Sequence, residues 1–154
     1  MQEILSTEVK FLEAWEAESE IVESLPSLTE REWAIMNIFW NKKDLSVQDV
    51  IDELALKEKK HYQTVKKQIE ILVKKGFLTK TKKSPLWLYS PKFGKRAVVF
   101  KEVTHFIESI AGSSLSETYL DMIEKRTFHP VELKNIMEKI LNLMLAQFKE
   151  YEEK

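Results

Sequence analysis

The segment HYQTVKKQIEILVKKGFL, residues 61–78, decides the fold because it combines an amphipathic helix with a sharp stop. Val65, Ile69 and Leu72 follow the i, i+4, i+7 spacing of a single apolar stripe. The opposite face is polar and mostly basic, with Gln63, Lys66, Lys67, Glu70 and Lys74. Gly76 follows two lysines and marks the predicted end of the helix. The pattern predicts a helix that packs by one side and offers the other to a polyanion.

A basic hairpin is expected directly after this helix. Residues 77–84 (FLTKTKKS) are β-prone and lysine-rich, and residues 85–90 (PLWLYS) supply the second strand. Trp87 and Tyr89 alternate with Leu86 and Leu88 there, so one member of each pair faces the core. The sequence leaves open which member that is.

Two short helices are predicted before residues 61–78. Thr29 and Glu32 have the spacing of a capping box before an apolar run, and residues 41–44 (NKKD) read as the turn that follows. Ser46 and Asp49 cap a second short helix. Three short helices followed by a hairpin predict a winged helix-turn-helix, in which the third helix enters the major groove of DNA.

Composition favours a mainly helical protein of one domain or one domain with an accessory part. The 154 residues include only three glycines and four prolines, and 44% are hydrophobic. Cysteine is absent, which excludes disulfides, thiolate metal sites and cysteine nucleophiles. No apolar run approaches the ~18 residues of a membrane span, and the acidic N-terminus is unlike a secretory signal. We therefore expect a cytoplasmic protein.

The net charge of -1 hides a basic segment. Residues 57–101 contain fourteen lysines and arginines but only two acids, Glu58 and Glu70, a balance of +12. The rest of the chain is acidic, most strongly in residues 1–25, whose balance is -6. Such a segment indicates where a polyanion binds, although a solvated lysine-rich face is the simpler alternative.

Three parts are expected along the chain: a helical extension (1–25), a winged-helix DNA-binding domain (26–92) and a helical dimerisation domain (93–154). The last part reads as three helices, and the apolar surface of the final one is too wide for a single neighbour. A second copy of the chain is the simplest cover, so we expect a homodimer. The predicted dimer contacts are Phe106, Ile110, Ile136, Ile140, Leu141, Met144 and Phe148.

The residues expected to contact DNA lie on the second and third helices and the wing. They are Ser46, Gln48, His61, Tyr62, Gln63, Thr64, Lys66, Lys67, Lys74, Lys80, Lys82 and Lys83. Gln63 suits adenine, Thr64 suits a thymine methyl or a phosphate, and the helix lysines suit guanine acceptors or the backbone. Ser46 and Gln48 would hold a phosphate through backbone amides, and the wing lysines would contact the DNA backbone. Lys74 and Lys75 fit a role in complementing the helix dipole equally well.

Enzyme and cofactor motifs are missing from the sequence. The three histidines have no metal-site spacing, and there is no phosphate-binding glycine loop or nucleophile elbow. We expect neither catalysis nor a bound cofactor or metal. Two other hypotheses stay open: a winged-helix module that binds protein, which the basic segment opposes, and a ligand-responsive regulator of the MarR kind.

Residues 28–43 (LTEREWAIMNIFWNKK), 46–54 (SVQDVIDEL) and 64–78 (TVKKQIEILVKKGFL) resemble the three DNA-binding helices of the penicillinase-repressor family, BlaI/MecI/CopY. The resemblance extends from residue 28 to about residue 145 and is most specific over 28–90. It implies a bacterial transcriptional repressor that binds a palindromic operator as a homodimer, with an N-terminal winged helix and a C-terminal dimerisation domain.

The chain departs from that family in four places. Residues 1–25 have no counterpart in the family. Antibiotic-responsive members are cleaved at an Asn-Phe bond, and His105-Phe106 stands at that position here. Because the Asn is missing, cleavage by a regulatory protease is put in doubt as the switch. A small-molecule inducer stays open as the alternative. The paired cysteine motifs of the copper-responsive members are absent. Lys66 replaces the usual arginine and loses its bidentate fork, so sequence reading there should be looser.

Overall fold

The structure, a computed structural model, describes residues 2–55 and 61–152. Lys57, Lys59 and Lys60 of the basic segment lie outside the described residues. The chain divides into two compact units, residues 18–101 and residues 1–17 with 102–154. The helix α1 (Gln2–Glu23) contributes to both of them. The first of these units contains the winged helix.

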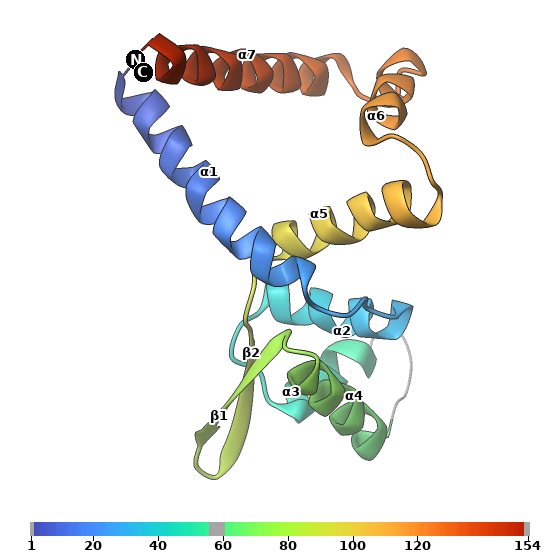
Figure 1. The fold of residues 1–154 in the computed structure, drawn as a ribbon. Coiled ribbons are helices and arrows are strands. Elements are labelled where there is room, and N and C mark those ends of the chain that lie inside the picture. Colours follow the sequence, from blue (N-terminus) through green and yellow to red (C-terminus); the bar gives the residue numbers. More distant parts are fainter. Residues whose placement is uncertain (1, 56–60, 153–154) are drawn as a thin grey trace. The chain divides into compact units, whose positions relative to one another are not determined.

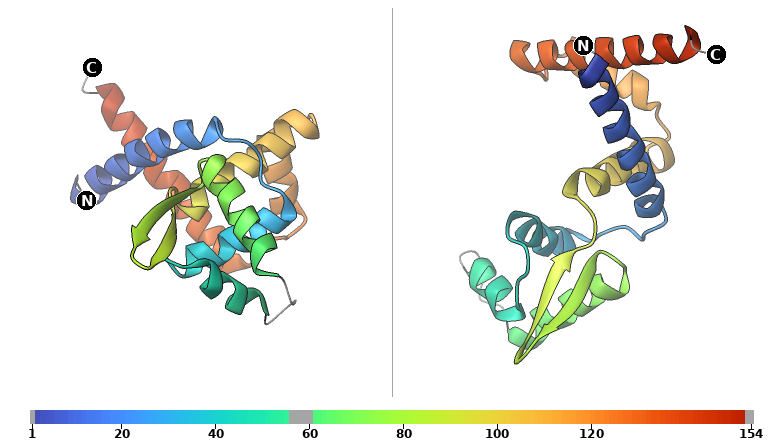
Figure 2. Two further views of the ribbon diagram at one scale, coloured as in Figure 1. Left: turned by 90° about the horizontal axis from the view of Figure 1, so that it is seen from below. Right: turned by 90° about the vertical axis from the view of Figure 1, so that its left-hand side faces the viewer.

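The unit of residues 18–101 consists mainly of three short helices and a hairpin (Figure 1 and Figure 2). The helices are α2 (Glu30–Asn41), α3 (Val47–Ala55) and α4 (Tyr62–Lys74), and the antiparallel strands are β1 (Leu78–Lys83) and β2 (Leu86–Pro91). The first turns of α5 (Lys95–His105) complete it. The predicted winged-helix arrangement is confirmed.

Capping residues fix where α2 begins. The Thr29 hydroxyl accepts a hydrogen bond from the Glu32 amide, and the Glu32 carboxylate accepts one from the Thr29 amide at 2.8 Å, as the capping box predicts. Glu32 is almost buried, and its carboxylate also pairs with the Lys75 ammonium at 2.8 Å. This ion pair links the start of α2 to the end of α4.

The end of α4 is a Schellman motif built on Gly76. The Gly76 amide donates to the Val73 carbonyl at 3.1 Å, and the Phe77 amide donates to the Leu72 carbonyl at 3.0 Å. Gly76 has a φ of +89°, a conformation that glycine adopts without steric cost. The chain therefore leaves the helix abruptly and enters β1, as predicted.

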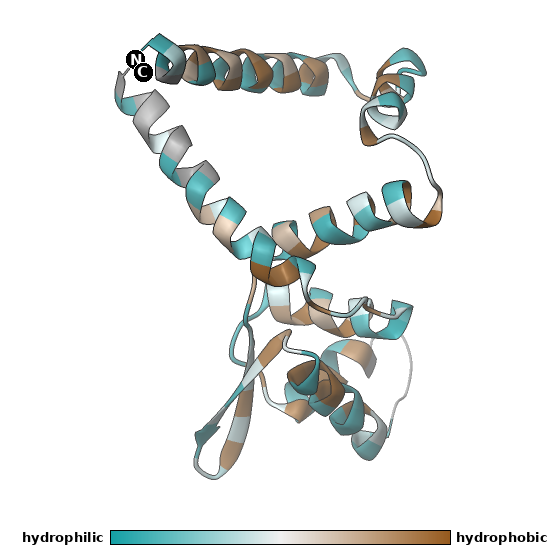
Figure 3. Ribbon diagram, in the orientation of Figure 1, coloured by the Kyte–Doolittle hydropathy of each residue, from teal (hydrophilic) through white to brown (hydrophobic). Residues whose placement is uncertain are grey.

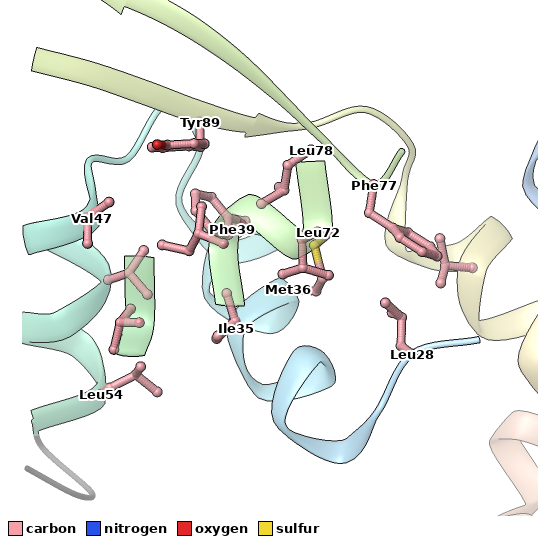
Figure 4. Close-up of a cluster of buried hydrophobic side chains, with 14 of the residues drawn as sticks. Leu28, Ile35, Met36, Phe39, Val47, Leu54, Leu72, Phe77, Leu78 and Tyr89 are labelled. Carbon is pink, nitrogen blue, oxygen red and sulfur yellow. The ribbon is translucent and has the colours of Figure 1, made fainter. Parts of the chain in front are cut away.

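The core of this unit lies between the three helices and the base of the hairpin (Figure 4). Its largest fully buried side chains include Phe39 of α2, Leu72 of α4, Phe77 and Tyr89. Tyr89 is thus the strand residue that faces the core, while Trp87 nearer the hairpin tip is 45% exposed. The Leu45 amide and carbonyl both pair with Tyr89, adding a short third segment beside the hairpin.

Residues on both sides of the range 26–92 pack into this core. Val22 near the end of α1 is fully buried, as are Ala97 and Val98 of α5. The Glu18 carboxylate accepts a hydrogen bond from the Gly94 amide at 2.7 Å, and the Lys101 ammonium donates to the Leu25 carbonyl at 2.9 Å. The end of α1 and the start of α5 therefore belong to the winged-helix unit.

The second unit is helical. Beyond α5 the chain continues as a π-helix, η1 (Phe106–Ile110), followed by α6 (Leu115–Glu124) and α7 (Pro130–Glu152). Ser114 caps α6, and Gly112 has a φ of +63° just after η1. The helices predicted for this region are confirmed, with the π-helix as an addition. Figure 3 shows apolar and polar residues alternating along α7.

No helix in the described ranges is both long and apolar enough to span a membrane.

Candidate nucleic-acid interface

The third helix, α4, packs by one face and leaves the other exposed. Val65, Ile69 and Leu72 are fully buried, as their spacing predicts. The opposite face and the first turn of α4 are exposed. Their exposed residues are Tyr62, Gln63, Thr64, Lys66, Lys67 and Lys74. His61 occupies the N-cap position, is exposed and makes no capping hydrogen bond through its side chain. Hydrogen-bonding and cationic groups are therefore available along a continuous helical face.

The wing adds a second set of cations. The strands pair Lys80 with Tyr89 and Lys82 with Trp87. The Lys80 ammonium lies 4.7 Å from the centroid of the Trp87 ring, and the Lys82 ammonium lies 5.7 Å from it. Lys83, next to the hairpin turn, is exposed. The exposed Trp87 ring is thus flanked by lysines.

An open pocket of about 200 Å³ joins three elements of this surface. Its lining includes Ser46 and Gln48 at the start of α3, Tyr62 and Lys66 of α4, and Lys80 of the wing. Five of the residues predicted to contact DNA therefore meet in one hollow. Trp87 is an apolar wall of it. The remaining predicted residues lie on other parts of the surface: His61, Gln63, Thr64, Lys67, Lys74, Lys82 and Lys83.

The side chain of Ser46 is used inside the protein. It is almost buried, and its amide and hydroxyl donate to the Asp49 carboxylate at 2.8 and 2.7 Å. These hydrogen bonds hold the pKa of Asp49 below its ordinary value. The Gln48 side chain donates to Asp52 at 2.9 Å. Because Ser46 and Asp49 satisfy each other's amides, the amides of Val47 and Gln48 are the ones at this helix start that lack an intrahelical partner.

The two lysines at the end of α4 differ in role. Lys75 is half-buried and donates to the Ser27 carbonyl at 3.1 Å as well as to Glu32. It therefore stabilises the fold and does not face outward. Lys74 is exposed. The sequence pattern predicts the same helix-dipole role for both lysines, because no neighbouring residue distinguishes one from the other.

Glu70 lies on the same face of α4, but it is not among the residues that the sequence pattern predicts to contact DNA. Its carboxylate accepts hydrogen bonds from the Lys80 ammonium at 2.6 Å and from the Tyr89 hydroxyl at 2.8 Å. The pKa of Glu70 lies below its ordinary value, chiefly because Lys80 donates to the carboxylate. The pKa of Tyr89 is raised by burial and by Glu70. Only the fold brings residues 70, 80 and 89 together, so no sequence spacing could reveal the cluster.

The second unit carries the other predicted surface. Of the expected dimer contacts, Ile136 is half-buried in the single chain, and the other six are exposed by 47% to 66%. These six are Phe106, Ile110, Ile140, Leu141, Met144 and Phe148. Further apolar residues of α7 are also exposed, among them Met137 and Leu145. An apolar helix surface of this kind needs a cover.

His105 and Phe106 lie at the junction between α5 and η1, and both are exposed. Within the described part of the chain, no three or more His, Asp or Glu side chains gather in a group that could hold a metal ion.

Comparison with known proteins agrees with this geometry. The sequence pattern of the family described as "Penicillinase repressor" matches residues 28–142. The chain belongs to the penicillinase-repressor family. This family consists of DNA-binding transcriptional repressors, and the basic winged helix is the part of the chain suited to that role.

Two regulatory proteins of Staphylococcus aureus align with nearly three quarters of this chain. The methicillin resistance regulatory protein MecI of Staphylococcus aureus strain N315 is 27% identical over 115 residues, which cover 73% of this chain and 94% of MecI. A penicillinase repressor of Staphylococcus aureus is 23% identical over 111 residues, covering 72% of this chain and 87% of that protein.

Among solved structures, the DNA-binding domain of the repressor BlaI matches 48% of this chain and 90% of its own, with 23% identity and a TM-score of 0.44. The zinc-responsive MarR family member ZitR of Lactococcus lactis matches 94% of this chain and 99% of its own, with 18% identity and a TM-score of 0.38.

Proposed function

We propose that this chain represses transcription by binding a palindromic operator in double-stranded DNA as a homodimer. The observation that supports this most is the exposed polar face of α4, which adjoins a lysine-rich wing within the basic segment of the chain. A helix of this kind fits the major groove while the wing follows the phosphate backbone. A cytoplasmic location follows from this role.

The base-reading residues of this proposal lie in the first turns of α4. Gln63 can pair bidentately with adenine, and Thr64 can contact a thymine methyl or a phosphate. Lys66 and Lys67 reach guanine acceptors or the backbone, and lysine reads guanine less specifically than arginine does. His61 and Tyr62, at the entry of the helix, are placed for phosphate contact.

The phosphate-binding residues surround them. Lys82 and Lys83 of the wing and Lys74 of α4 are exposed cations. Val47 and Gln48, whose amides stand at the positive end of α3, line the pocket together with Lys66. Amides at a helix start together with a lysine suit a phosphate oxygen. The pocket is therefore the place where we expect one backbone phosphate to bind.

The homodimer is proposed from the apolar surface of the second unit. The exposed residues of η1 and α7 form the surface, and burying it in a second copy removes it from water. An obligate dimer of this kind buries about 2,000 Å² or more. Two copies would then present two α4 helices to two half-sites, which is why the operator should be palindromic.

The salt dependence of duplex binding tests the DNA-binding part of the proposal. A protein that makes ~6–10 phosphate contacts loses roughly 10³–10⁵ in affinity between 50 and 200 mM salt. We expect a fall of this size when a labelled duplex is titrated at several salt concentrations. An affinity that does not change with salt would refute binding through the lysines. Selecting bound fragments from genomic DNA would then supply the operator and its symmetry.

Light scattering at micromolar concentration tests the dimer. We expect twice the 18.2 kDa mass of the chain. A monomer at this concentration would refute the homodimer but leave the DNA-binding proposal standing.

A further inference from the structure

An acidic residue, Glu70, lies on the basic face of α4. It is one of only two acids in residues 57–101, and Lys66 and Lys74 lie one helical turn before and after it. An acid among cations that are expected to face phosphates weakens the attraction of that surface for DNA. The contacts of Glu70 show what it does there.

Glu70 holds a wing lysine in place. Its carboxylate accepts the hydrogen bond from the Lys80 ammonium at 2.6 Å, and the Lys80 side chain is only 29% exposed. The same ammonium lies over the rings of Trp87 at 4.7 Å and Tyr89 at 5.6 Å. The Tyr89 hydroxyl, at 2.8 Å, fixes the position of the carboxylate from the core side. Lys80 is thus neutralised and partly covered.

The neighbouring wing lysines are different. Neither Lys82 nor Lys83 forms an ion pair with any residue that the structure describes. Both lie within three positions of Lys80 on β1, and all three lysines are expected to contact the DNA backbone. Lys80 differs from Lys82 and Lys83 because its ammonium is paired with the Glu70 carboxylate.

We propose that Glu70 limits the affinity of this interface for DNA of any sequence, because it keeps Lys80 in an internal ion pair and so withholds one phosphate contact. This inference rests on the proposed DNA-binding function. Phosphate contacts carry no direct sequence information, so the contact that is withheld would have strengthened binding to every duplex. The base-reading side chains of α4 are left unaffected.

Replacing Glu70 by glutamine is the direct test. Glutamine keeps the shape and the acceptor for the Tyr89 hydroxyl but releases the charge of Lys80. On a duplex of arbitrary sequence, E70Q should bind more tightly than the native chain. The slope of log affinity against log salt should steepen by about 0.9, the value for one further phosphate. The advantage of E70Q should therefore shrink about 3.5-fold between 50 and 200 mM salt.

The matched control is Glu53→Gln. Glu53 of α3 is also paired with a lysine, Lys42, and its side chain is 34% exposed against 32% for Glu70. The two variants change the net charge equally, but neither Glu53 nor Lys42 is among the residues expected to contact DNA. The slope should therefore stay unchanged in E53Q. The double variant E70Q/K80Q assigns the effect to Lys80, since it should lose most of the gain of E70Q.

The outcomes separate this inference from the function on which it rests. A native chain that shows no salt-dependent binding overturns the DNA-binding proposal itself. A native chain that binds as proposed, with an E70Q variant of unchanged thermal stability and equal or weaker affinity, overturns the role of Glu70 alone. A gain that persists in full in E70Q/K80Q also overturns it, because simple charge repulsion would then suffice.

Discussion

Single residues in the left-handed region of backbone conformation fix the ends of several helices. Gly76 ends α4 and Gly112 follows η1, both with positive φ. They differ in their surroundings. A Cβ on Gly76 would lie 3.2 Å from the Leu25 Cδ2 atom, whereas a Cβ on Gly112 would meet no atom within 4 Å. Gly76 therefore combines a conformational and a packing requirement.

Replacing Gly76 by alanine should lower the free energy of unfolding by about 1–3 kcal/mol, because a non-glycine residue in this conformation is strained and its Cβ crowds Leu25. Gly112→Ala has the strain without the crowding and should cost less. Urea denaturation of both variants measures the difference. Equal losses of unfolding free energy in the two variants would show that crowding against Leu25 does not destabilise Gly76→Ala.

Among the secondary-structure elements, hydrogen bonds of polar side chains position the helices of the candidate nucleic-acid interface. Glu32 joins α2 to α4 through Lys75, Ser46 and Asp49 start α3, and Glu70 joins α4 to the wing. The hydrogen bonds lower the pKa values of Asp49 and Glu70, so the folded chain favours the ionised form of these two carboxylates. The stability of these two junctions should therefore depend on pH at the acidic end.

The Ser46–Asp49 cap supplies a prediction with a definite sign. The pKa of Asp49 is lower in the folded chain than its ordinary value, so its contribution to stability is complete above about pH 4 and is lost as the pH falls through the lowered pKa. Asp49→Asn should be less stable than the native chain by about 1 kcal/mol at pH 7, the usual size of a capping contribution.

Urea unfolding at pH 7, 5, 4 and 3 checks this prediction. The gap between the native chain and D49N should narrow toward pH 3. Glu70, whose pKa is also lowered, titrates in both proteins and cancels in the comparison. A gap that is constant with pH would mean that the charge of Asp49 contributes nothing.

For the molecule as a whole, the proposed function depends on a second copy of the chain. A homodimer binds both half-sites of a palindrome at once, so the second contact forms at a high effective concentration. The proposed repressor therefore needs its apolar α7 surface as much as it needs the lysines of the winged helix.

Leu141→Glu should convert the protein to a monomer, because Leu141 is 55% exposed in the single chain and a glutamate there would be buried without a partner in the dimer. Affinity for a full palindrome should fall by about 10²–10⁴, whereas affinity for a half-site should change little. Light scattering and duplex titration measure the two effects.

The matched control for L141E is Asn135→Glu, at an exposed polar position of the same helix. It should leave the mass and the affinity for the palindrome unchanged. Retained helical circular dichroism in L141E would show that the single chain still folds. A dimeric L141E with native affinity would place the dimer contacts elsewhere.

Local sequence patterns were sufficient to predict the secondary structure of the winged helix and the basic character of its surface. The apolar stripe of α4, the capping boxes at Thr29 and Ser46 and the stop at Gly76 all appear as predicted. These features depend on residues within one or two helical turns of each other, so their spacing along the chain is sufficient evidence. The basic charge of residues 57–101 was equally visible without coordinates.

Which lysines form internal ion pairs depends on tertiary packing. Lys75 and Lys80 resemble their neighbours in sequence, yet each is paired with a carboxylate from 10 to 43 positions away. Tertiary packing also brings Val22 and Val98 into the winged-helix core and buries Tyr89 more fully than its neighbour Leu88. Such pairings depend on how elements pack, because distance along the chain does not limit which side chains meet in the folded state.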